Sequence, residues 1–212
     1  MEQIDSFDTI MGIDEAGRGP VLGPMVVSGV VLDRRAEAVL KELGIKDSKQ
    51  LSPKQRQKFF EHINEEAKWY KVVVIWPETI DQFVLKKALN HLECDAMSDI
   101  IDSYGMDTDV YIDSPQTPVV FTKMLEARLN TQVRINCSFK ADAIYPVVSA
   151  AGILAKVSRD AIITELQKEY GDFGSGYPGD PKTKKFLAGL KDYPYFVRMS
   201  WKTVSKEQDL LF

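Results

Sequence analysis

The sequence predicts an α/β fold in which helices flank one central mixed sheet. Short apolar runs alternate with stretches of helical pattern along the whole chain. The apolar runs are continuous, as expected for strands that helices cover on both faces. The chain has 212 residues, 44% of them hydrophobic, so it can bury a core of this kind. The pattern contains no internal repeat, low-complexity tract or flexible linker.

Local signals indicate where single elements begin and end. Ser52 suits an N-cap, Pro53 fits the first helical position and Gln55 completes a capping box, so a helix should begin there. A short apolar strand stops abruptly before Pro115. The expected strands are residues 9–14, 25–32, 69–76, 109–113 and 132–139. The expected helices are residues 53–67, 78–103 as one helix or two, 117–129, 146–170 and 181–189.

Composition limits the class of protein. The net charge is −4, so contact with DNA or RNA must be local, because non-specific affinity for phosphates comes from lysine and arginine. The apolar runs are far shorter than the roughly 20 residues that span a bilayer, and residues 1–8 lack the pattern of a secretory signal. Two isolated cysteines, Cys94 and Cys137, suit a reducing compartment and the role of small buried hydrophobes. We therefore expect a cytoplasmic protein that does not contact membranes.

Acidic residues stand where three predicted segments end or pause. Asp14 and Glu15 follow the first strand, Asp113 ends a later strand, and Asp142 precedes the long helix. A carboxylate at the end of an apolar strand is costly to bury as an ion unless a positive group compensates its charge. A bound cation is the simplest such group.

The adjacent pair carries a further expectation. Asp14 and Glu15 would point to opposite faces of a regular strand, so for both to reach one site the chain should turn here, with Gly17 supplying the freedom. Hard oxygen ligands suit Mg²⁺ or Mn²⁺. Four acids could hold two such ions, which would activate a water and stabilise the leaving oxygen of a phosphoryl displacement. The carboxylates alone leave a nuclease, a phosphatase and a plain acidic surface as alternatives.

A long motif narrows these alternatives. The segment GIDEAGRGP at residues 12–20, followed by GPMVV at residues 23–27, closely resembles the opening signature of the ribonuclease HII family. Further matches follow in the family's order: KDSKQL at 46–51, YIDS at 111–114, KADAIYPV at 140–147, ILAKV at 153–157 with RD at 159–160, and GSGYP at 174–178. The segment VRMSWKT at residues 197–203 resembles the archaeal and eukaryotic branch. The resemblance covers essentially the whole chain.

The resemblance implies the ribonuclease H-like α/β fold with a small C-terminal helical extension. We expect residues 1–172 to form the catalytic domain, and residues 173–212 to pack on it as part of a single structural unit. By the same resemblance, Asp14, Glu15, Asp113 and Asp142 match the four metal-binding catalytic acids. These are the acids that the chemistry of the strand ends had singled out.

Substrate contacts follow from the resemblance as well. Gly17, Arg18 and Gly19 match the family's loop that contacts the ribose 2′-hydroxyl at the RNA-to-DNA junction. Tyr177 matches the tyrosine that stacks on the adjoining deoxyribose. Small glycines let backbone groups approach the sugar, and the 2′-hydroxyl distinguishes RNA from DNA. Without the family, the loop would be interpreted as a hairpin turn and Tyr177 as an ordinary loop aromatic.

Several residues beside the motifs carry smaller expectations. Lys46, Lys49 and Lys156 should hold phosphates, with Lys46 and Lys156 the preferred pair. Asp47 lies in a matched motif but is expected to be structural. Gly152 departs from the family, which commonly has serine there, and a mid-helix glycine costs up to about 1 kcal/mol relative to alanine.

The end of the chain suggests a protein partner. Some archaeal relatives end in a short clamp-binding peptide, and residues 208–212 fit it in part: Gln208 and Leu211 have the right separation, but Phe212 comes too early. A sliding clamp is therefore a candidate partner through the tail. The archaeal type also implies a monomer.

The expected activity is that of a divalent-metal-dependent endoribonuclease. It would hydrolyse the RNA strand of RNA–DNA hybrids and cut 5′ of ribonucleotides embedded in duplex DNA, leaving 3′-hydroxyl and 5′-phosphate ends. Ribonuclease HIII is the nearest rival, but it carries a substantial N-terminal domain and only eleven residues precede Gly12 here. A non-catalytic hybrid-binding protein would gain nothing from four acids facing phosphates. A transposase- or resolvase-like nuclease would cut DNA without ribose.

Overall fold

A five-stranded sheet forms the centre of the molecule. A computed structural model describes residues 7–45 and 51–204. The strands are β1 (Thr9–Ala16), β2 (Met25–Asp33), β3 (Trp69–Ile75), β4 (Asp109–Asp113) and β5 (Arg134–Ser138), in the order β3-β2-β1-β4-β5. β2 pairs antiparallel with β1 and β3, whereas β4 pairs in parallel with β1 and β5. The sheet is therefore mixed, which confirms the predicted fold class.

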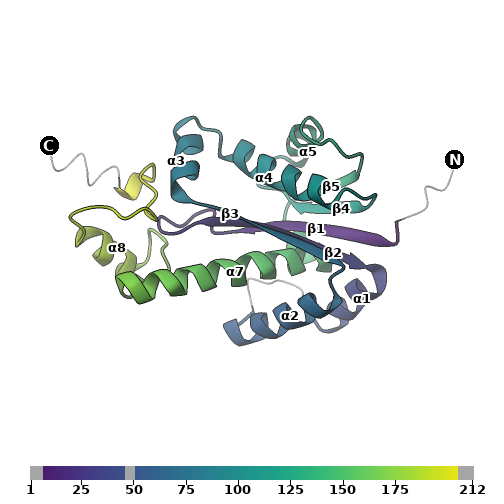
Figure 1. The fold of residues 1–212 in the computed structure, drawn as a ribbon, viewed down its shortest axis with the longest axis horizontal. Helices are drawn as coiled ribbons and strands as arrows, with labels where there is room; N and C mark the ends of the chain where they lie inside the picture. Colours follow the sequence, from purple (N-terminus) through teal and green to yellow (C-terminus); the bar gives the residue numbers. More distant parts are fainter. Residues whose placement is uncertain (1–6, 46–50, 205–212) are drawn as a thin grey trace.

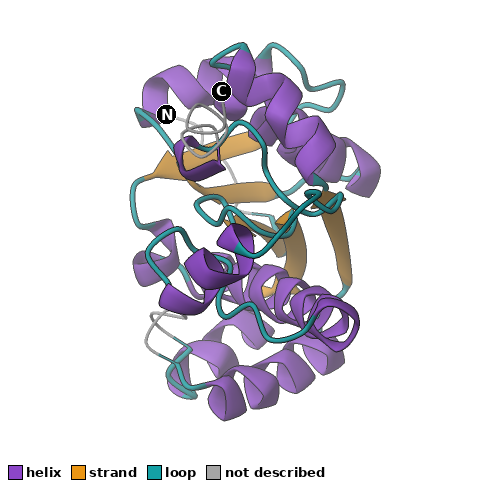
Figure 2. Cartoon of the chain, turned by 90° about the vertical axis from the view of Figure 1, so that its left-hand side faces the viewer, coloured by secondary structure: helices purple, strands orange, loops and turns teal. Residues whose placement is uncertain are grey.

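Helices cover both faces of the sheet and make three layers (Figure 1, Figure 2). One face is covered by α1 (Arg34–Glu42), α2 (Pro53–Glu66) and α7 (Pro146–Tyr170). The other is covered by α3 (Pro77–Leu85), α4 (Leu89–Tyr104) and α5 (Pro118–Glu126). The single turn α6 (Ala141–Ile144) follows β5, and α8 (Pro181–Ala188) lies near the C-terminal end of the described chain.

Local sequence signals account for most of these boundaries. The capping box at the start of α2 is present, because the Ser52 hydroxyl accepts from the Gln55 amide and the Gln55 side chain accepts from the Ser52 amide. The helix predicted over residues 78–103 is two helices, separated at Lys87, whose φ is 56°. Helix α1 was not predicted; it is short, and its nine residues bury only Ala36 and Leu40.

The apolar core lies on both faces of the sheet. Neighbouring residues of β1 point to opposite faces. Ile10 therefore joins the cluster under α7, and Met11 joins the cluster under α4. Gly12 lies where β1 and α7 are in close contact, since a Cβ there would lie 2.1 Å from the carbonyl oxygen of Val147.

A third apolar cluster joins the C-terminal segment to one end of the sheet. It brings together Leu22, Ile163 of α7, Leu187 of α8 and Phe196. Leu22 also forms an isolated β-bridge with Val197. The division of the chain at residue 172 remains a prediction.

Two further expectations concern membranes and cysteines. In the part of the chain that the structure describes, every helix is too short or too polar to cross a bilayer. Cys94 is buried and Cys137 is half-buried. Burial raises the pKa of both thiols, to about 11 for Cys94, which disfavours the reactive thiolate form.

Candidate active site

Asp14 and Asp113 lie at the same end of two neighbouring strands. β1 and β4 run parallel, and their last aligned pair is Ile13 with Ile112. Asp14 and Asp113 are the next residue of each strand, so the register itself brings them together. Asp14 is buried, and Asp113 is half-buried at the point where β4 stops.

Asp142 reaches these two residues from a helix rather than from the end of a strand. After β5, Lys140 adopts a left-handed conformation with a φ of 55°, and this turn starts α6. The Ala141 amide then donates to Oδ1 of Asp113 at 3.0 Å, which fixes α6 against β4. Asp142 follows as a buried member of α6. One carboxylate oxygen from each of Asp14, Asp113 and Asp142 lies within 4.8 Å of the others.

Glu15 differs from its expectation. The predicted turn after Asp14 is wrong, because β1 continues through Glu15 to Ala16 in regular pairing with β2. Asp14 and Glu15 therefore alternate across the sheet. Both still line the same pocket, since β1 extends past the end of β4. The cluster of three convergent carboxylates does not include Glu15.

The gathered acids make Asp14 hard to ionise. Burial is the largest cause of its raised pKa, and the charges of Glu15, Asp113 and Asp142 add to it, while the Glu15 amide, which donates to Asp14 at 2.8 Å, opposes it. A divalent cation bound among these oxygens would reverse this effect by favouring the ionised form. Hard oxygen donors of this kind fit Mg²⁺ or Mn²⁺.

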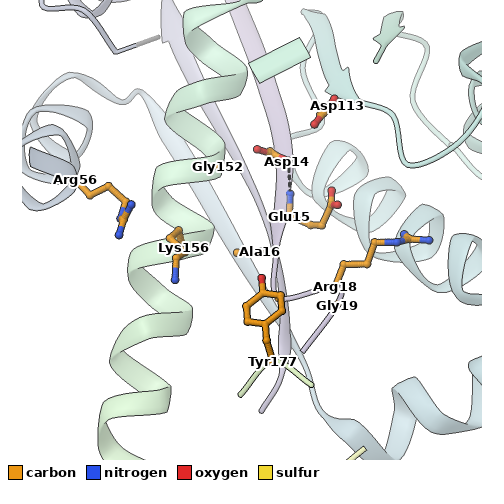
Figure 3. Close-up of a pocket in the computed structure, with 11 residues that line it drawn as sticks. Asp14, Glu15, Ala16, Arg18, Gly19, Arg56, Asp113, Gly152, Lys156 and Tyr177 are labelled. Carbon is orange, nitrogen blue, oxygen red and sulfur yellow. Dashed lines mark hydrogen bonds between the residues drawn. The ribbon is translucent and has the colours of Figure 1, made fainter. Parts of the chain in front are cut away.

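Cationic side chains stand on both sides of the acids. The pocket has a volume of about 350 Å³, and Figure 3 shows Arg56 and Lys156 on one side of it and Arg18 on the other. Arg56, from α2, was not predicted, since nothing in the pattern of an amphipathic helix distinguishes it. The remaining lining residues belong to β1, the loop after it, the end of β4, α7 and the C-terminal segment: Asp14, Glu15, Ala16, Gly17, Gly19, Asp113, Gly152 and Tyr177.

The loop after β1 is held from behind by the C-terminal segment. Arg198 donates to the carbonyl oxygens of Gly17 at 2.5 Å and of Arg18 at 2.9 Å, and Trp201 Nε1 donates to that of Gly19 at 3.0 Å. Gly17 has a φ of 85°, a conformation that favours glycine. Three successive carbonyl groups are thus engaged on the inner side of the loop.

Two buried arginines stabilise this region, and sequence reasoning assigned neither of them a role. Arg159 donates to the carbonyl oxygens of Leu22 at 3.0 Å and Pro24 at 3.1 Å, while Arg198 also donates to that of Gly23 at 3.1 Å. Burial lowers the pKa of both arginines. For Arg198 the charge of Arg159 adds to this effect, and the pKa falls to about 9. Their partners are backbone carbonyls, which leave no pattern in a sequence.

The other predicted substrate residues lie around the pocket mouth. Tyr177 is 48% exposed, and its ring lies 3.5 Å from where a Cβ on Gly19 would be. Lys156 forms an ion pair with Asp160 one turn along α7, and Gly152 lines the pocket one turn earlier. Lys46, Asp47 and Lys49 lie outside the described residues.

Comparison with known proteins identifies the family. The family model for ribonuclease HII matches residues 11–204. The chain belongs to the ribonuclease HII family. Ribonuclease HII of Pyrococcus furiosus is 45% identical over 206 residues, covering 94% of this chain and 91% of the relative. The ribonuclease H2 structure from Pyrococcus horikoshii OT3 aligns with a TM-score of 0.88 at 38% identity, covering 95% of this chain and 98% of that one.

A second solved structure is that of the PCNA:RNase HII complex from Archaeoglobus fulgidus. It aligns with a TM-score of 0.83 at 38% identity and covers 92% of this chain and 95% of that one. As a ribonuclease HII, the chain is a metal-dependent endoribonuclease that acts on RNA–DNA hybrids. The match is to ribonuclease HII, the family that the motifs predicted, rather than to a transposase- or resolvase-like nuclease.

Proposed function

We propose that Asp14, Glu15, Asp113 and Asp142 are the catalytic acids of this ribonuclease HII and hold two Mg²⁺ or Mn²⁺ ions. The observation that carries the proposal is the convergence of three carboxylate oxygens within 4.8 Å of one another. Two of these acids, Asp14 and Asp113, line a pocket whose walls also carry Arg18, Arg56 and Lys156. When bound together with substrate, the ions supply an activated water and stabilise the leaving oxygen. Asp14 and Asp113 would hold them from adjacent strand ends, Asp142 from α6 and Glu15 from the far side of β1.

The loop at residues 17–19 would select the ribose. Because its carbonyl oxygens are engaged by Arg198 and Trp201, the loop can turn its remaining backbone groups to the substrate, and Gly19 is exposed to receive it. Contact with a 2′-hydroxyl would distinguish RNA from DNA. Tyr177, across from Gly19, would stack on the neighbouring deoxyribose. A cut 5′ of the ribonucleotide that leaves 3′-hydroxyl and 5′-phosphate ends is what membership of the family implies.

Local positive charge would hold the duplex on an otherwise acidic protein. Arg18 and Lys156 flank the acids and can neutralise backbone phosphates, which position a duplex without reading its sequence. Lys46 remains a candidate for the same role. We expect the enzyme to act in the cytoplasm as a single chain.

Three matched duplexes test this function. With Mg²⁺ or Mn²⁺ we expect cleavage of an RNA–DNA hybrid and of DNA containing one ribonucleotide, and none of all-DNA. End analysis of the product should give 3′-hydroxyl and 5′-phosphate. EDTA should stop the reaction, whereas a non-catalytic binding protein would keep its ligand. Cleavage of the all-DNA duplex would refute the proposed ribose selection.

A sliding clamp is a second proposed partner. The relative from Archaeoglobus fulgidus was solved in complex with PCNA, and residues 208–212 fit a clamp-binding peptide in part; they lie outside the described residues. Deleting residues 208–212 is expected to abolish retention on an immobilised archaeal clamp while leaving cleavage of a short duplex unchanged. Equal retention of the shortened and full chains in a pull-down would refute clamp binding through residues 208–212.

A further inference from the structure

Two polar side chains of α4, outside the pocket, hold Arg18 in place. Its guanidinium donates through Nη1 to Oε2 of Glu93, and through Nη2 to Oδ1 of Asn90 at 2.7 Å. Asn90 and Glu93 are three residues apart and share one face of the helix. Figure 3 shows Arg18 across the pocket from Lys156, with its guanidinium directed away from the acids.

Glu93 is an unusual residue for its position. Its side chain is 0% exposed, against 33% for that of Arg18. The buried atom Oε1 has no hydrogen-bond partner among the described residues. Its neighbours Leu92 and Met97 belong to the apolar core, and an apolar residue would serve packing there at a lower desolvation cost. A buried carboxylate that contacts a pocket-lining arginine therefore points to a role beyond stability.

Asn90 extends the contact to the strand end that carries Asp113. Its Nδ2 donates to Oε1 of Gln116 at 2.6 Å. The backbone carbonyl of Gln116 accepts from the Ser114 hydroxyl at 2.8 Å, and Ser114 directly follows Asp113. Arg18 is thus tied through α4 to the segment that follows β4.

Glu93 and Asn90 act on the side chain of Arg18 rather than on its backbone. The loop backbone is already fixed by Arg198 and Trp201. An unrestrained arginine side chain loses rotamer freedom when it binds, and fixing it beforehand removes that cost. We propose that Glu93, together with Asn90, is a positioning residue that preorganises the Arg18 guanidinium to receive a backbone phosphate of the bound duplex. This inference rests on the proposed function.

The variant Glu93→Gln separates positioning from simple electrostatics. It keeps the size of the side chain and its hydrogen-bonding capacity but removes a negative charge beside the binding pocket. Electrostatics alone would therefore tighten binding of the anionic duplex. Positioning instead predicts that KM for a duplex with one embedded ribonucleotide rises about tenfold while kcat stays within about twofold. A KM equal to or below that of the wild type would overturn the proposal.

A double-substitution cycle tests whether Glu93 acts through Arg18. We expect Arg18→Ala to raise KM, and the double variant Arg18→Ala/Glu93→Gln to have that KM or a lower one, because the second change has nothing left to position and removes a negative charge. A further rise in the double variant would overturn the proposal. The matched control is Asp99→Asn, which removes a carboxylate from the exposed side of α4, where it pairs with Lys71 at 2.8 Å, and should leave KM unchanged.

Thermal denaturation of each variant separates this effect from loss of the fold. If Glu93→Gln is too unstable to assay, Asn90→Ala takes its place and should also raise KM, by a smaller factor. An unchanged KM for Asn90→Ala would then overturn the proposal. The outcomes also distinguish the two proposals. A wild type that fails to cut the duplex contradicts the proposed function. A wild type that cuts it with the same KM as Glu93→Gln contradicts only the role of Glu93.

Discussion

Asp14→Asn is expected to reduce cleavage on the order of 10³-fold or more while leaving the chain folded. Asp14 supplies one of the three convergent carboxylate oxygens, and an amide in its place is an uncharged and weaker ligand for a divalent cation. The change is nearly isosteric, so the buried strand end keeps its packing. Initial rates on a duplex with one embedded ribonucleotide, in Mg²⁺ and in Mn²⁺, measure the loss. Circular dichroism checks the fold.

The same substitution should stabilise the metal-free protein in a pH-dependent way. The pKa of Asp14 is raised above its ordinary value of 3.8, first by burial and then by the neighbouring acids. Ionising it in the folded state is therefore unfavourable. Its destabilising contribution is absent below the unfolded pKa, grows as pH rises from the unfolded to the folded pKa, and is fully present above the folded pKa. We expect Asp14→Asn to melt above the wild type in EDTA at neutral pH, with the difference vanishing below about pH 4.

The control for both effects is Asp107→Asn, which removes an exposed acid just before β4, at the other end of that strand from Asp113. It should change neither the cleavage rate nor the pH dependence of melting. Adding Mg²⁺ should raise the melting temperature of the wild type more than that of Asp14→Asn, since a ligand stabilises the state that binds it. An Asp14→Asn variant with full activity would remove Asp14 from the catalytic assignment.

Much of this site could be predicted because strand ends are visible in a sequence. The apolar run before Asp113 shows where β4 stops, and the run before Asp14 places that residue beside it in β1, although β1 itself continues to Ala16. The capping box at Ser52 is equally local, and so is the start of α2. The motif at residues 12–20 then identified the chemistry.

The remaining features depend on contacts that no local pattern records. Asp142 was predicted as a site residue, but its approach through a left-handed residue and a single turn of helix was not, because periodicity does not reveal it. Glu93 looks like a surface residue of an amphipathic helix until Arg18 is seen beside it. Arg198 binds backbone carbonyl groups, which every residue possesses. The turn predicted after Asp14 is not needed, because a regular strand that extends past its neighbour can present both of its faces to one pocket.

Gly12→Ala is expected to destabilise the protein by about 3 kcal/mol. Gly12 is buried in β1, and an added Cβ would lie 2.1 Å from the carbonyl oxygen of Val147 and 2.7 Å from the amide nitrogen of Val148. Backbone atoms of α7 cannot move aside as a flexible side chain can, so the helix itself must shift from the sheet. The melting temperature should fall by roughly 6–12 °C for a chain of this size.

The shift of α7 should also reach the active site, because α7 carries Gly152 and Lys156 along one wall of the pocket while β1 carries Asp14. Gly12→Ala should therefore lose activity at temperatures where it is still folded. Gly179→Ala is the matched control: nothing lies within 4 Å of the added Cβ, so it should be neutral or stabilise by up to about 1 kcal/mol. Equal melting temperatures for the two variants would mean that β1 and α7 are not in the close contact that brings Lys156 to the acids.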